Sequence, residues 1–123
     1  MATHNLHGLF SREAAADLSA LVFRFMSLTA NQIATVSGQG ILPDGVLQDK
    51  PIAGEAGLLC PLNGSISKVE AGAAVAANAD VMTDANGRAV TATATNQIAG
   101  KALQAASAAG EIIEVLVGFR GEA

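Results

Sequence analysis

The stretch of sequence that decides the fold runs from Val69 to Phe119 and reads VEAGAAVAANADVMTDANGRAVTATATNQIAGKALQAASAAGEIIEVLVGF. It alternates short apolar or Thr-rich runs with turn residues, so several strands can form in succession. None of these runs is long enough to bury its own apolar face. The strands therefore need one another, and the prediction is a mainly β fold, either a small barrel or a sandwich.

The Asn86-Gly87 pair is the sharpest local signal in this stretch. A two-residue hairpin turn of the primed type needs positive φ at both central residues, which Asn and Gly tolerate best. The pair predicts a hairpin that joins Asp80–Asp84 to Arg88–Thr95.

The closing run, Glu111–Phe119, alternates as a strand that covers a core on one side. We expect the first of its faces to lie in the core and the second to be free to contact another molecule. The first face carries Ile113, Val115, Val117 and Phe119, and the second carries Ile112, Glu114, Leu116 and Gly118.

Composition limits the classes of function. A chain of 123 residues is expected to form one domain. Its net charge of −4 repels a phosphate backbone, so no nucleic-acid partner is predicted. With four Phe and no Trp or Tyr the core should be thin, and we expect association into a homo-oligomer to add stability.

The N-terminal region predicts an arm followed by a short helix. Residues Met1–Phe10 hold few apolar side chains, and we expect them to become ordered on a partner with Leu6 and Phe10 as anchors. Good helix formers follow an N-cap serine, which predicts a helix over Ser11–Ala20. The expected organisation is an arm and helix over residues 1–20 and a β domain over residues 21–123. The N-terminus lacks the features of a signal peptide and no run could span a bilayer, so we expect synthesis in the cytoplasm and no membrane.

Further strands are predicted over Leu21–Leu28, over Gln32–Ser37 and around Val46-Leu47. Asn63-Gly64 predicts a second hairpin, between Leu58–Leu62 and Ser65–Val69, with Pro61 at an edge or bulge. Ala-Gly-Glu precedes a strand twice, at residues 53–55 and 109–111, which hints at an internal repeat. Propensity favours a helix over residues 101–108, but the flanking glycines fit a strand equally well.

The residues that could bind metal or act as nucleophiles lack partners. His4 and His7 could share a metal only on a helix, and no acid or cysteine stands beside them. Cys60 is the single cysteine and lies in an apolar run that blunts its thiolate. We expect Cys60 to be reduced and buried.

The remaining motifs are incomplete. Gly38–Gly40 begins like a dinucleotide loop without its third glycine, and Gly100-Lys101 is not followed by the Ser or Thr of a phosphate-binding loop. The trio Asp80, Asp84 and Asn86 lacks the closing Glu of a calcium loop. The sequence therefore predicts no enzyme, no metal and no cofactor.

The order of several short motifs carries a family resemblance. Ala-Gly-Glu at residues 53–55 is followed by Asn-Gly-Ser-Ile-Ser-Lys-Val at 63–69, Ala-Asp-Val at 79–81 and Thr-Asp at 83–84. Ile-Ala-Gly-Lys-Ala-Leu-Gln-Ala at 98–105 and a second Ala-Gly-Glu before an aliphatic strand complete the series. In this order the chain resembles the capsid cement, or head decoration, proteins of tailed bacteriophages.

The resemblance implies a small β protein on the outer capsid surface of the virion, made in the host cytoplasm during assembly. It implies a homotrimer that binds the major capsid protein and cements neighbouring subunits, and a strand over Lys101–Ala108. The arm anchors Leu6 and Phe10 and the free face of Ile112, Glu114 and Leu116 are then the expected contacts. The alternative is a non-enzymatic β adaptor or a tail-associated interaction module.

Overall fold

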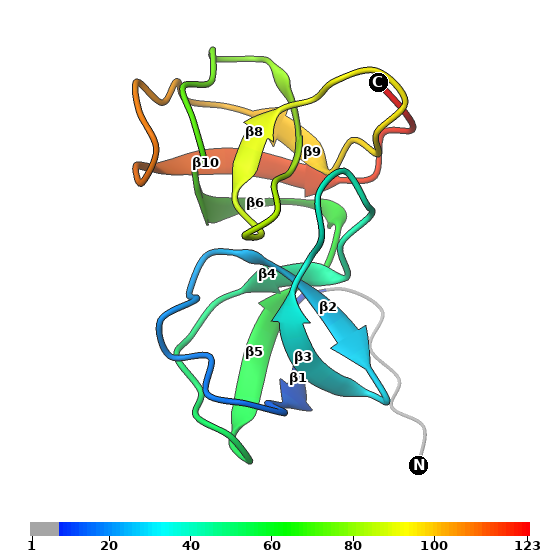
Figure 1. Cartoon of the computed structure of the whole chain (residues 1–123), viewed down its shortest axis with the longest axis vertical. Coiled ribbons are helices and arrows are strands. Elements are labelled where there is room, and N and C mark those ends of the chain that lie inside the picture. Colours follow the sequence, from blue (N-terminus) through cyan, green and yellow to red (C-terminus); the bar gives the residue numbers. More distant parts are fainter. Residues whose placement is uncertain (1–7) are drawn as a thin grey trace.

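The computed structural model describes residues 8–123, and this part of the chain forms ten strands and no helix. The strands make two antiparallel five-stranded sheets, one above the other in Figure 1. Sheet A is the lower one, with the strand order β1-β5-β4-β2-β3. Its strands are β1 (Phe10–Glu13), β2 (Phe25–Thr29), β3 (Gln32–Val36), β4 (Gly45–Leu47) and β5 (Ala56–Cys60).

Sheet B is the upper one, with the strand order β6-β10-β9-β7-β8. Its strands are β6 (Asn63–Glu70), β7 (Asp80–Thr83), β8 (Ala89–Thr91), β9 (Gly100–Ala102) and β10 (Ile112–Gly118). The mainly β prediction is confirmed, in a sandwich-like form and without a closed barrel.

Each sheet has its own apolar core, and sheet A contributes to both. Successive residues of a strand point to opposite faces. Met26, Leu47 and Leu59 accordingly pack in the core of sheet A, while their neighbours belong to the core of sheet B. Those neighbours are Phe25, Val46 and Cys60. Strands β2, β4 and β5 are therefore covered on both faces.

Sheet B repeats the topology of sheet A. Adding five to each strand number of sheet A gives the order of sheet B. An isolated parallel bridge also closes each set in the same place, from Ala14 to Ile33 in sheet A and from Ala71 to Ala89 in sheet B. We refer to residues 10–60 as repeat 1 and residues 63–118 as repeat 2.

The two Ala-Gly-Glu motifs occupy matching places in these repeats, just before β5 and β10. In each repeat the alanine after the first strand donates to the glutamate carbonyl of the motif and accepts from its glycine, with N···O distances of 2.8 or 2.9 Å. The residues are Ala14, Glu55 and Gly54 in repeat 1 and Ala71, Glu111 and Gly110 in repeat 2. The tripeptide therefore marks a structural repeat, as its double occurrence suggested.

The tip of the β7–β8 hairpin joins the two repeats. The amide of Phe25 on β2 donates to the Gly87 carbonyl at 2.7 Å. Beside it, the Glu70 carboxylate lies 3.3 Å from Arg24 and 3.6 Å from Arg88, and Arg88 lies 3.3 Å from Asp84. These four side chains are each about one fifth exposed, so the network spans a mostly buried seam.

The predicted hairpin at Asn86-Gly87 is confirmed, but its turn differs from the expected type. Of the two residues, only Gly87 has a positive φ, at 76°. Asp84 and Arg88 close a longer loop, because the Asp84 amide donates to the Arg88 carbonyl at 2.8 Å. The second strand is also shorter than predicted and ends at Thr91.

The second predicted hairpin, at Asn63-Gly64, is wrong. β5 pairs with β1 and β4, whereas β6 pairs with β10, so the segment between β5 and β6 leads from one sheet to the other. Pro61 has no N–H to extend the ladder of β5, which favours the end of that strand at Cys60. Asn63–Gly64 then begins β6 instead of turning back.

Two other segments also differ from expectation. The helix predicted over Ser11–Ala20 is absent, because Phe10–Glu13 pair with β5 as strand β1. Pairing with a sheet outweighs a helix propensity that is marginal in so short a segment. The segment Lys101–Ala108 contains no helix, and its strand is limited to β9 and an isolated bridge from Ala106 to Val75.

Candidate docking face

The outer face of β6 and β10 is the best candidate for a functional surface. In the antiparallel register of these strands, Glu114 lies opposite Lys68, and Leu116 lies opposite Ile66. Along β10 the side chains alternate as predicted, with Ile113, Val115 and Val117 buried. Phe119 was wrongly expected in the core, because the strand ends at Gly118 and the Phe119 side chain is 54% exposed. We use the name docking face for Ile66, Lys68, Ile112, Glu114 and Leu116.

This face exposes apolar groups and charges that have no ion-pair partner among residues 8–123. Ile66 on the edge strand β6 is 61% exposed, and Ile112 at the start of β10 is 44% exposed. Within residues 8–123, neither Lys68 nor Glu114 forms an ion pair. Exposed apolar side chains beside unpaired charges mark protein interaction surfaces.

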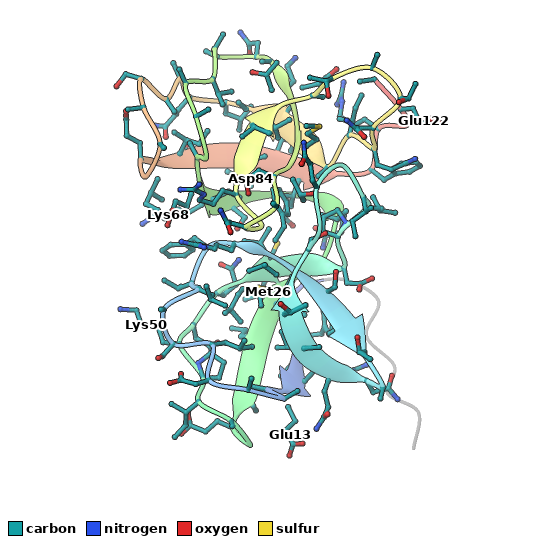
Figure 2. All side chains as sticks on the ribbon, viewed as in Figure 1. Glu13, Met26, Lys50, Lys68, Asp84 and Glu122 are labelled. Atoms are coloured by element: carbon teal, nitrogen blue, oxygen red, sulfur yellow. The ribbon has the colours of Figure 1, made fainter. Side chains whose placement is uncertain are left out.

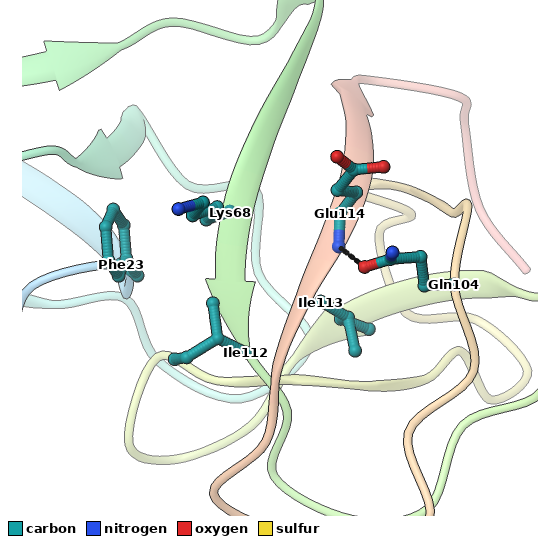
Figure 3. A pocket seen from close by; sticks show the side chains of 6 residues that line it. All are labelled: Phe23, Lys68, Gln104, Ile112, Ile113 and Glu114. Atoms are coloured by element: carbon teal, nitrogen blue, oxygen red, sulfur yellow. Dashed lines mark hydrogen bonds between the residues drawn. The ribbon is translucent and has the colours of Figure 1, made fainter.

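Phe23 forms one wall of a pocket on the docking face. The pocket has a volume of about 380 Å³ and is also lined by Lys68, Gln104, Ile112, Ile113 and Glu114 (Figure 3). The Lys68 ammonium lies 6.0 Å from the centre of the Phe23 ring, within the range of a cation–π contact. In Figure 3 the Lys68 side chain extends toward Phe23 and away from Glu114.

The backbone of Phe23 is held in a left-handed conformation, with a φ of 64°. For a bulky residue this costs on the order of 1–3 kcal/mol and persists only where the surroundings enforce it. Here the Phe23 amide donates to the Leu47 carbonyl at 2.7 Å, and the Phe23 carbonyl accepts from the Glu70 amide at 2.9 Å. These bonds, one to each sheet, fix the ring at the seam.

On the opposite side of the pocket, Gln104 orients the segment that follows β9. Its side-chain oxygen accepts from the Glu114 amide at 3.0 Å (Figure 3). The Leu103 amide donates to the Glu114 carbonyl at 2.9 Å. The backbone of Glu114 is thus fully engaged, while its carboxylate remains available to a partner.

The predicted contact residues fall in different places. Ile112 and Glu114 line the pocket, and Leu116 follows on the same face of β10. Phe10 lies on β1 in sheet A, half-buried against the core of that sheet, with Arg12 5.3 Å from its ring centre. Leu6 lies outside the described residues.

Phe23 and Lys68 were not among the predicted contacts. Lys68 could be identified only from the pairing of β6 with β10, which the sequence predictions did not include. The sequence predicts Phe23 within a strand over Leu21–Leu28, whereas Phe23 precedes β2 in a conformation that its residue type disfavours.

The other motifs considered in the sequence have structural roles. Gly38–Gly40 links the repeats, since the Gly40 amide donates to the Thr83 carbonyl at 2.9 Å and the Thr83 hydroxyl donates to the Gly38 carbonyl. Asp84 holds the hairpin loop by accepting from the Asn86 and Arg88 amides, each at 2.8 Å.

Cys60 is buried as expected, and its burial raises the pKa of its thiol. Among residues 8–123, no three His, Cys, Asp or Glu side chains are grouped so as to hold a metal ion, and His4 and His7 lie outside this range. The same residues include no helix long and apolar enough to cross a bilayer.

Comparison with known proteins identifies a family and a similar solved structure. A family profile described as phage cement protein matches residues 24–118. Among solved structures, the chain is similar to the head fiber gp8.5 N base of bacteriophage phi29, with a TM-score of 0.74 at 16% sequence identity. The alignment covers 94% of this chain and 97% of that one, so the two share a fold over nearly their whole lengths. No curated protein sequence matches the chain.

Proposed function

Since the chain belongs to the phage cement protein family and is a structural protein of the bacteriophage capsid, we propose that it binds the outer capsid surface and cements neighbouring major capsid subunits. It stabilises the head by this binding and catalyses no reaction. The family match confirms the family that the order of the sequence motifs predicts. The cementing of neighbouring capsid subunits is our proposal.

The observation that carries the proposal is the docking face. A protein that fastens subunits needs an exposed surface with apolar anchors and directional polar groups, and it needs no pocket of convergent catalytic side chains. Ile112 and Leu116 would supply apolar contact, and Glu114 and Lys68 would supply charges that form no ion pair within the described residues.

Co-sedimentation with capsids of the cognate phage tests the proposal. The protein should sediment with mature, DNA-filled heads and should raise the temperature at which they release DNA. The double variant Ile112→Ser with Leu116→Ser should bind more weakly, whereas Ile52→Ser, at an apolar residue of repeat 1 that is 51% exposed, should bind normally. Heads that neither bind the protein nor gain stability would exclude a cementing role.

We also propose that the protein acts as a homotrimer, because a chain with few aromatic residues gains stability by association. The expected result is three copies, measured either by light scattering of the free protein or by imaging on capsids. Monomers in both states would contradict this proposal.

The N-terminal segment is proposed as a second contact with a neighbouring subunit or with the shell. Since Phe10 already pairs within sheet A, the test should leave it intact. Deletion of residues 2–7, and separately Leu6→Ser, should weaken capsid binding without unfolding the sheets. Unchanged binding by both variants would show that the arm has no such role.

A further inference from the structure

Phe23 and Asn78 occupy the same place in the two repeats. The amide of each donates to the carbonyl of the last residue of the fourth strand, Leu47 in repeat 1 and Ala102 in repeat 2, at 2.7 Å in both cases. The two backbones match in conformation as well, with φ values of 64° and 70°. Asn adopts the left-handed region at a much lower cost than Phe does.

Repeat 2 therefore shows which residue type this turn prefers, and the turn itself gives no reason for a ring at position 23. The reason lies in what the ring contacts. It forms the wall of the pocket on repeat 2 and stands beside the Lys68 ammonium (Figure 3). Strained residues of this kind gather where a ligand or partner is held.

The charges of the pocket are also particular to repeat 2. The cross-strand pair Lys68 and Glu114 corresponds in register to Ser11 and Leu58 of repeat 1, which carry no charge. Opposite charges that face each other across two strands usually attract. Here they form no ion pair, and Lys68 is directed instead toward Phe23.

We propose that this pocket receives a segment of a capsid subunit with a complementary charge pattern. An acidic side chain of the segment pairs with Lys68, a basic side chain pairs with Glu114, and an apolar side chain packs against Phe23 and Ile112. Phe23 and Lys68 then determine which partner is recognised. This inference rests on the proposed function, because it names the partner chemistry of the same docking face.

The first test places at position 23 the residue type that repeat 2 has at the equivalent position, Asn78. Phe23→Asn should leave the unfolding midpoint in urea equal or higher, because it removes the strain of the left-handed Phe. Capsid binding should nevertheless weaken by at least about tenfold, because the apolar wall is lost. A variant that is as stable as the original chain and binds as tightly would overturn the inference.

The second test exchanges the two charges. Lys68→Glu and Glu114→Lys should each weaken binding by about tenfold or more, because like charges at an interface repel. The double exchange keeps the net charge and the cross-strand attraction, yet it should also bind poorly, because both charges then face like charges of the partner. The matched control exchanges Lys50→Glu with Glu122→Lys, at two exposed sites away from the pocket (Figure 2).

The outcomes separate this inference from the proposed function. If the original chain does not bind capsids, the proposed function fails. If the original chain binds and the variant that carries both exchanges binds equally well, the partner does not distinguish which position carries which charge, and the inference is wrong. If the exchanges alter only the oligomeric state of the free protein, the pocket is an interface between copies and the inference is also overturned. Should the exchanged proteins fail to fold, the neutral variants Lys68→Gln and Glu114→Gln are expected to weaken binding, and normal binding by both would refute it.

Discussion

Gly87 is the residue on which the contact between the repeats depends most directly. Its φ of 76° disfavours any other residue, and an added Cβ would lie 2.6 Å from the Phe25 carbonyl oxygen and 2.9 Å from Cβ of Val36. Backbone atoms cannot move aside as the end of a flexible side chain can. A substitution here therefore combines strain in the turn with overlap at the seam.

We predict that Gly87→Ala lowers the free energy of unfolding by roughly 2–4 kcal/mol, measured by urea denaturation. Gly54→Ala is the matched control, because Gly54 also has a positive φ, of 87°, but has nothing within 4 Å of an added Cβ. The free energy of unfolding of this control should fall only by the cost of the strained backbone, about 1 kcal/mol. Equal losses in the two variants would show that the overlap at Gly87 is relieved by movement of the hairpin.

Glu111 shows how a side chain just before β10 fixes its own turn. Its carboxylate accepts from the Ser107 hydroxyl and from the amides of Ser107 and Ala108. These hydrogen bonds, with that of the Ser107 hydroxyl the strongest, hold the pKa of Glu111 below its usual range. A lowered pKa means that this stabilisation is present above the pKa of the unfolded chain and is lost as the pH falls through the folded value.

We predict that Ser107→Ala raises the pKa of Glu111 toward the ordinary value for Glu, about 4.3. An NMR titration of the side-chain carboxyl carbons would measure it. Asp17 is an internal control, because the pKa of its carboxyl is lowered by hydrogen bonds from Ser19, so it should titrate identically in both proteins. An unchanged pKa of Glu111 would mean that the amides of residues 107 and 108 alone keep this pKa low.

At the scale of elements, the ionic network fixes strand β6 and the β7–β8 hairpin against the segment that precedes β2. We predict that Glu70→Gln lowers the free energy of unfolding by about 1–3 kcal/mol, because it leaves Arg24 and Arg88 mostly buried with less compensation. Asp80→Asn removes the ion pair with Arg120, whose side chains are each 45% exposed, and should cost less than about 1 kcal/mol. Comparable losses would show that the network at the seam is no stronger than a surface pair.

Elements with a complete local pattern could be predicted from the sequence. The sequence predicts β10 because Ile113, Val115 and Val117 alternate along it, and it predicts the β7–β8 hairpin because turn residues separate two runs that favour strands. The Asn63-Gly64 hairpin was wrong because a turn signal does not specify which strands will pair. Local residues indicate a change of direction, whereas the choice between two sheets depends on distant contacts such as that of β6 with β10.

Only part of the candidate site could be predicted from the sequence, for the same reason. Alternation placed Ile112 and Glu114 on one face of a strand, which needs no tertiary information. The position of Lys68 beside them depends on register between two strands that lie far apart in the sequence. The position of Phe23 depends on its backbone hydrogen bonds to both sheets, which hold it in a left-handed conformation that is unfavourable for Phe.

At the scale of the whole molecule, the two repeats have separate apolar cores that are joined by side chains of sheet A packed into the core of sheet B. Phe25, Val46 and Cys60 belong to strands of sheet A but pack in the core of sheet B. The Gly87 carbonyl and the Arg24 to Glu70 ion pair join the sheets at the same seam. Neither core can be exposed without removing contacts from the other sheet, so unfolding should be cooperative.

We predict a single calorimetric transition with equal calorimetric and van't Hoff enthalpies, as for a two-state protein. Phe25→Ala, at a fully buried side chain, should lower the free energy of unfolding by about 3–5 kcal/mol. Ile33→Ala gives the sharper test, because Ile33 lies only in the core of sheet A. In a cooperative molecule it must reduce the hydrogen-exchange protection of the slowest amides in both sheets by the same amount, since these amides exchange through global unfolding. Loss of protection confined to sheet A would mean that the repeats unfold separately and that the seam is a weak joint between them.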